Sequence, residues 1–151
     1  MNKTKQYKSI LSIFLLNLSL YTTAQHLLVK DGFVRELPPK VRYTAAYFTL
    51  ENLDQKAKKL IHISTPIARE VQLHETKKVK NEVFMERKQA FNIPAQGQLK
   101  LEPKAKHLML IGLKKRLKQG DEVKFKLHFQ DGSKQTMTLP IRASHTLHHH
   151  H

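Results

Sequence analysis

The sequence has 151 residues, enough for one domain with a packed core but not for two domains of ordinary size. Hydrophobic residues make up 40% of the chain, which excludes disorder throughout, and the absence of cysteine excludes a disulfide framework, a thiolate zinc site and thiol redox chemistry. The formal net charge of +15 suits either a solvated surface or peripheral contact with an anionic membrane.

The first 24 residues have the layout of a secretory signal peptide. Lys3, Lys5 and Lys8 precede an apolar run over residues 10–20, and the small residues Thr22 and Ala24 follow it. The run is shorter than the roughly 20 apolar residues that a membrane-spanning helix needs. We therefore expect residues 1–24 to be cleaved near Ala24 and the mature protein to be periplasmic, which argues against a nucleic-acid partner.

The mature sequence consists of short segments with the pattern of β-strands. In residues 123–129, apolar residues at every second position alternate with polar ones, which is typical of a strand with one buried face. Further strands are predicted at 45–50, 59–63, 70–75, 83–88, 98–101, 106–113 and 137–141, and an irregular loop at 35–40. This pattern predicts one all-β domain, an antiparallel sandwich or barrel, over residues 25–142.

Two histidines and two methionines carry the clearest chemical signal. Ten residues separate His74 from Met85, twenty-one more precede His107, and Met109 lies two positions further on. Residues two apart on a strand project to the same face, roughly 7 Å apart, so His107 and Met109 can converge on one point. Leu73 should face the core, which leaves His74 on the opposite face or at the end of the strand. Thioether sulfur selects copper(I) and imidazole binds several metals, whereas zinc prefers thiolate, imidazole or carboxylate.

The four residues and their flanks resemble the periplasmic copper chaperones called PCuAC proteins, whose pattern is His-x10-Met-x21-His-x-Met. The resemblance covers essentially the whole mature chain. It is carried by residues 29–35 with Pro38 and Pro39, 45–50 with Asn52, 73–76, 93–95, 107–110, 112–114, Leu117, 120–121 and 129–132. It implies a cupredoxin-like Greek-key β-sandwich with copper(I) at His74, Met85, His107 and Met109. It also implies delivery to the copper-A subunit of a respiratory oxidase or to another exported copper protein.

Two other functions remain open from the sequence, copper sequestration without a specific recipient and a secreted β domain that binds polyanions. An enzyme is not expected, because there is no spare acid–base pair or nucleophile arrangement and four ligands leave no open metal position. Met137 is predicted to lie in the core, and His62 and His128 on the surface.

The C-terminal tail, residues 143–151, is rich in histidine. It is either a native secondary site, with copper(II) or zinc as candidate ions, or a purification tag. The residues concerned are His145, His148, His149, His150 and His151.

Overall fold

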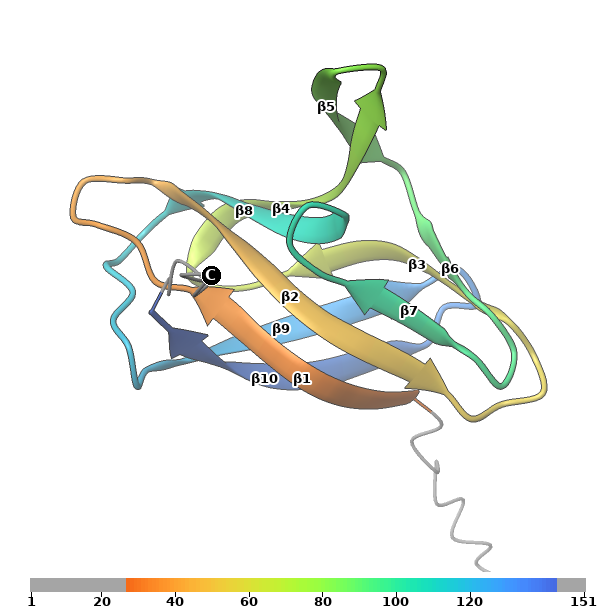
Figure 1. The fold of residues 1–151 in the computed structure, drawn as a ribbon. Coiled ribbons are helices and arrows are strands. Elements are labelled where there is room, and N and C mark those ends of the chain that lie inside the picture. The colour runs from red at the N-terminus through yellow and green to blue at the C-terminus, as the bar shows by residue number, and fades with distance from the viewer. Residues whose placement is uncertain (1–26, 144–151) are drawn as a thin grey trace, which may run out of the picture.

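The computed structural model describes residues 27–143, which form ten β-strands and no helix (Figure 1). Residues 27–143 therefore contain no helix that is long and apolar enough to cross a bilayer. The expected signal peptide, its cleavage site and the histidines of the tail lie outside the described residues. The strands are β1 (Leu27–Arg35), β2 (Tyr43–Asn52), β3 (Lys58–Ser64), β4 (Ala68–Val79), β5 (Glu82–Lys88), β6 (Phe91–Ile93), β7 (Gln98–Leu101), β8 (Lys106–Leu113), β9 (Glu122–Phe129) and β10 (Lys134–Arg142).

The strands form a continuous path that is folded into two layers. The first layer contains β5, β4, β8, β2, β1 and β7, and the second contains β10, β9, β3 and β6. Their order is β5-β4-β8-β2-β1-β10-β9-β3-β6, and β7 pairs with β2 beside this path. The two halves are joined by a short parallel pairing of β1 with β10, at Val34↔Ile141 and Arg35↔Arg142. Figure 1 shows β9 and β10 passing behind β1 and β2. The expected all-β sandwich is confirmed.

The core lies between the layers and follows the predicted alternation. Phe48 of β2, Leu108 of β8 and Phe125 of β9 belong to one buried cluster, and Met137 joins it as predicted. Since Leu108 and Leu110 point inward, His107 and Met109 lie on the outer face of the first layer.

The strands predicted from sequence are all present, with ends that differ by a few residues. The largest change is in β4, which continues to Val79 because it forms a hairpin with β5. The three-residue strand β6 was not predicted, since it is too short to show a period of two. Of the expected loop over 35–40, Arg35 belongs to β1.

An irregularity in β1 shapes the surface next to His107. The register with β2 shifts between Lys30 and Phe33, where Asp31 has a φ of 50°. After the shift Phe33 is the partner of Tyr47, and their ring centroids lie 5.2 Å apart. The bulge thus supplies Tyr47 with an aromatic neighbour.

Candidate metal site

The central feature of the site is a pair of histidines on neighbouring strands. His74 of β4 is the register partner of His107 of β8. Their ring centroids are 5.7 Å apart, with the ring planes tilted by 49°. Directly paired residues share a face of a sheet, so both imidazoles project from the outer face of the first layer. The pairing brings together two residues that are far apart in sequence.

Hydrogen bonds fix which nitrogen of His74 is protonated. Its Nε2 lies 2.8 Å from the side-chain oxygen of Gln72, an atom that only accepts, so Nε2 carries the hydrogen. The amide nitrogen of Gln72 in turn donates to Glu70 at 2.9 Å, which fixes the orientation of the amide. The Nδ1 of His74 is buried and has no hydrogen-bond partner. Its lone pair is therefore available to a metal ion.

His107 is held in the complementary tautomer. Its Nδ1 donates to the backbone oxygen of Ala105 at 3.0 Å, so in the neutral ring Nε2 is the nitrogen that carries no hydrogen. The same oxygen accepts the backbone N–H of Thr76 at 3.0 Å, so its position is fixed from β4 as well. Metal-binding histidines characteristically donate their second ring N–H to a carbonyl or carboxylate, and both imidazoles here are oriented in this manner.

The two methionines lie on the same outer face but at different depths. Met109 follows His107 by two residues and is partly buried between its register partners Gln72 and Ala45. Met85 lies one strand further out, opposite Thr76 in the β4–β5 hairpin, and its side chain is 54% exposed. The structure therefore brings together His74, His107 and Met109, with Met85 on the adjoining hairpin.

An aromatic side chain, itself hydrogen-bonded to an arginine, lies beside His107. Tyr47 packs against His107 with ring centroids 6.4 Å apart, and His107 is only 5% exposed. The guanidinium of Arg35 donates to the Tyr47 hydroxyl at 2.6 Å. Burial raises the pKa of Tyr47 above its ordinary value, although the charge and hydrogen bond of Arg35 oppose this. Tyr47 consequently stays a neutral phenol beside the buried His107.

Burial also keeps His74 in its neutral form. It lowers the pKa of this imidazole, the charges of His107 and Arg87 lower the pKa further, and Glu70 acts in the opposite direction. Arg87 is the register partner of His74 and forms an ion pair with Glu70 at 3.1 Å. A neutral imidazole is the form that binds metal.

The hydrogen-bonded series Glu70–Gln72–His74 was not identified from the sequence. Its members are two residues apart on β4 and therefore share a face, which is the rule that grouped His107 with Met109. Applying the rule to polar residues before His74 would have found them.

A second histidine pair lies on the other layer, where His62 of β3 faces His128 of β9 with ring centroids 5.2 Å apart. Burial lowers the pKa of His128, as do the charges of His62, Lys134 and Lys126. Within residues 27–143 no three side chains among His, Cys, Asp and Glu could hold a metal ion together. A site with three or four protein side-chain ligands at either pair would therefore need a donor outside these four residue types, and the thioether of Met109 lies two residues from His107.

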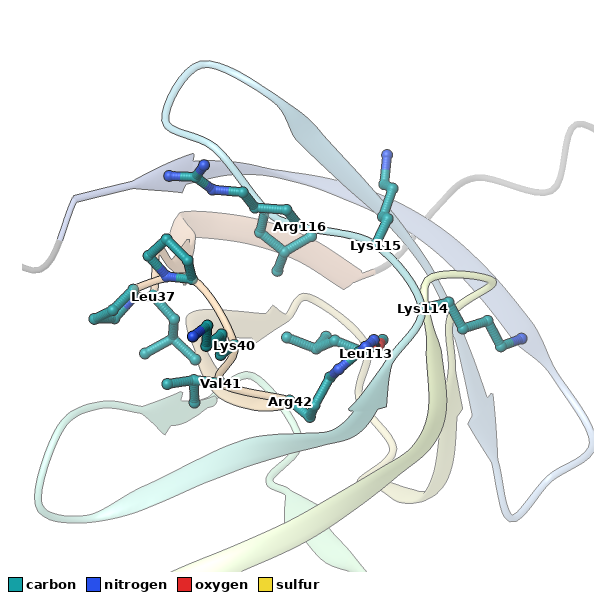
Figure 2. A pocket seen from close by; sticks show the side chains of 11 residues that line it. Leu37, Lys40, Val41, Arg42, Leu113, Lys114, Lys115 and Arg116 are labelled. Atoms are coloured by element: carbon teal, nitrogen blue, oxygen red, sulfur yellow. Dashed lines mark hydrogen bonds between the residues drawn. The ribbon is translucent and has the colours of Figure 1, made fainter.

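A cavity of about 320 Å³ lies at the opposite end of β8, between the loop over residues 37–42 and residues 113–117. Figure 2 shows Lys114, Lys115 and Arg116 extending outward from its rim. Arg42 donates to the backbone oxygen of Leu113 at 3.0 Å across this cavity. None of the four candidate ligands lines it, so it is separate from the metal site.

Solved structures with this fold include copper-bound proteins. The copper-bound PCuAC domain from PmoF2 superposes with a TM-score of 0.66 at 18% identity, over 78% of this chain and 93% of that domain. DR1885 from Deinococcus radiodurans, solved in its apo and copper(I) forms, has a TM-score of 0.63. The apo form is 33% identical and covers 80% of this chain and 81% of its own. The copper(I) form is 34% identical and covers 80% of this chain and 83% of its own. The protein thus has the fold of the PCuAC domains.

The family is defined by a sequence model described as "Putative lipoprotein LpqE-like", which matches residues 27–141. The chain belongs to this LpqE-like family. A protein of Leifsonia xyli subsp. xyli named "Putative lipoprotein Lxx21020" is 36% identical over 101 residues. The match spans 66% of this chain and 60% of that relative.

Proposed function

We propose that the protein is an exported copper chaperone that binds copper(I) through His74, His107, Met109 and Met85. The observation that carries the proposal is the pair of facing imidazoles, each with its second nitrogen already hydrogen-bonded to an acceptor. A buried ring nitrogen without a partner is costly unless a ligand completes it. The nearby thioether of Met109 supplies a soft donor, which favours copper(I) over zinc.

The relatives support the cargo and the compartment. DR1885, whose copper(I) form has been solved, is one third identical to this chain over most of its length. The lipoprotein description of the family is in keeping with the expected signal peptide and a periplasmic location. Delivery to the copper-A centre of a respiratory oxidase is the fuller form of the proposal, and sequestration is its alternative.

Anaerobic copper(I) titration against a competing chelator tests the binding site. The wild type should take up one tightly bound copper(I), and the double variant His74→Gln/His107→Gln should lose it. The matched control is His62→Gln/His128→Gln, which removes a facing pair of similar geometry without adjacent methionine and should retain wild-type affinity. Equal affinity in both double variants would contradict the proposed site.

A transfer experiment separates delivery from sequestration. Copper(I)-loaded protein is mixed with a copper-free soluble copper-A domain, and the copper content of each protein is measured after separation. Delivery predicts that copper moves to the acceptor faster than through a chelator of matched affinity. Retention of copper by a tightly binding protein would favour sequestration.

The C-terminal tail is proposed as an independent, weaker site. Deletion of residues 145–151 should leave copper(I) affinity nearly unchanged and lower the uptake of copper(II) or zinc. A collapse of copper(I) binding on deletion would assign the tail to the main site.

A further inference from the structure

The β4–β5 hairpin concentrates exposed apolar side chains at one projecting tip. Among residues 27–143, eight large apolar side chains are exposed, and four of them lie between positions 79 and 85. Their exposed fractions are 54% for Val79, 67% for Val83, 49% for Phe84 and 54% for Met85. Figure 1 shows this hairpin standing away from the two layers. Such a cluster of exposed apolar side chains indicates an interaction site.

The apolar side chains occupy both faces of the hairpin. Val83 pairs with Lys78 and Met85 with Thr76, which places them on the face of His74. Phe84 pairs with Lys77 and Val79 with Glu82, which places them on the opposite face. The rigid surface of a partner protein would cover one face and leave the other in water. A lipid interface surrounds an inserted tip and covers both.

The charges of the hairpin match an anionic surface. The projecting hairpin, residues 77–88, contains five basic and two acidic residues, a net charge of +3. Lys78 lies directly across from Val83, and Lys77, which is ion-paired with Glu86, lies across from Phe84. Long lysine side chains can bury their methylene groups and extend the ammonium to lipid phosphates. Basic residues near a membrane are attracted to anionic headgroups.

We propose that the projecting hairpin inserts its tip into the headgroup region of an anionic lipid bilayer and holds the protein at the membrane surface. The family is described as lipoprotein, yet this sequence has no cysteine thiol to which a lipid could be attached. The hairpin would attach the protein peripherally through its own side chains. Met85 belongs both to the tip and to the proposed copper site, so the tests use copper-free protein with all four candidate ligands intact.

A tryptophan reporter locates the contact, because the sequence contains no other tryptophan. Phe84→Trp protein is titrated with vesicles of phosphatidylglycerol and phosphatidylcholine, and with vesicles of phosphatidylcholine alone. The emission should shift to the blue only with the anionic vesicles. Ile61→Trp, at a 44% exposed position on β3, is the matched control and should show no shift. A shift of equal size at position 61, or none at position 84, would overturn the proposal.

Co-sedimentation with the same vesicles measures the contribution of each kind of residue. Val83→Ser/Phe84→Ser should lower the partition coefficient about tenfold, since two apolar side chains are lost from the interface. The exposed pair Leu53→Ser/Ile61→Ser should leave it unchanged, and circular dichroism confirms that each variant is folded. Equal vesicle binding by the two double variants would overturn the proposal. That result is expected if the hairpin instead binds a partner protein.

Charge reversal separates the hairpin from the overall positive charge. Lys78→Glu/Lys80→Glu is compared with Lys114→Glu/Lys115→Glu, which makes the same change in net charge at the rim of the distant cavity. The hairpin variant should lose at least tenfold more binding than the cavity variant. Equal losses would mean that binding follows net charge alone, and the hairpin would then have no specific role.

Discussion

His74 and His107 face each other across β4 and β8 with ring centroids 5.7 Å apart, and in its neutral form each donates its single ring N–H to a fixed oxygen. The remaining nitrogen of each ring is unprotonated, so neither tautomer has to change for a metal ion to bind. This relationship links the fold to the proposed function, because the register of two strands sets both the spacing and the protonation of the ligands.

The first prediction concerns Gln72, which orients His74 without being a proposed ligand. Gln72→Leu removes the acceptor of the Nε2 hydrogen, so the ring loses its fixed tautomer and copper(I) affinity should fall about tenfold. Gln72→Glu alone would place two carboxylates side by side, so the control is the exchange Glu70→Gln/Gln72→Glu, which keeps an acceptor for His74 and a donor beside it and should bind nearly as well as the wild type. Competition titration with a chelator measures both, and unchanged affinity in Gln72→Leu would contradict the assigned role.

The second prediction separates ligand sulfur from core sulfur. Met109→Leu and Met85→Leu keep an apolar side chain of similar volume, so the free energy of unfolding should change by less than about 1.5 kcal/mol. Each removes one soft donor, so copper(I) affinity should fall at least tenfold, or about 1.4 kcal/mol. Met137→Leu, in the core at 5% exposure, is the control and should keep its affinity. An equal loss of copper(I) affinity in all three variants would contradict the assignment of Met85 and Met109 as ligands.

The third prediction concerns pH. Burial lowers the pKa of His74 below 6.5, assisted by the charges of His107 and Arg87, so protons should compete with copper at this ring only below pH 6.5. Unfolded His74 has the ordinary pKa and binds more protons than the folded form between the two values. The free energy of unfolding should therefore fall as the pH drops below 6.5 and recover above it.

Two measurements check the direction of the pKa shift of His74 and its effect on stability. Ring resonances in an NMR titration of copper-free protein report the pKa of His74 directly. Urea denaturation at several pH values should show that His74→Gln has lost this part of the pH dependence. A pKa of His74 at or above 6.5 would show that burial does not dominate its environment.

The fourth prediction concerns the turn that carries Ala105. Lys104 has a φ of 66°, a conformation that glycine adopts without the steric cost of a side chain. Lys104→Gly should therefore raise the free energy of unfolding by about 0.5–1 kcal/mol. Lys104→Ala removes the same charge but keeps Cβ, so it should give no gain. Urea denaturation compares the two, and an equal gain in both would point to charge instead of backbone conformation.

Much of the fold followed from sequence because a half-buried strand has a period of two. That rule placed His107 and Met109 on one face and His74 away from the core, and the structure agrees. The pairing of His74 with His107 could not be predicted in the same manner, since the register of distant strands depends on the packing of the whole sheet. The role of Gln72 was missed because the same rule was not applied to the polar residues before His74 on this strand.

X-ray absorption spectroscopy of the copper(I)-loaded protein tests the central claim most directly. Two imidazoles and two thioethers predict sulfur and nitrogen scatterers together in the first coordination shell. The sulfur contribution should decrease in Met109→Leu and in Met85→Leu, and stay unchanged in Met137→Leu. A first shell of nitrogen and oxygen alone would contradict a copper site built from His74, Met85, His107 and Met109.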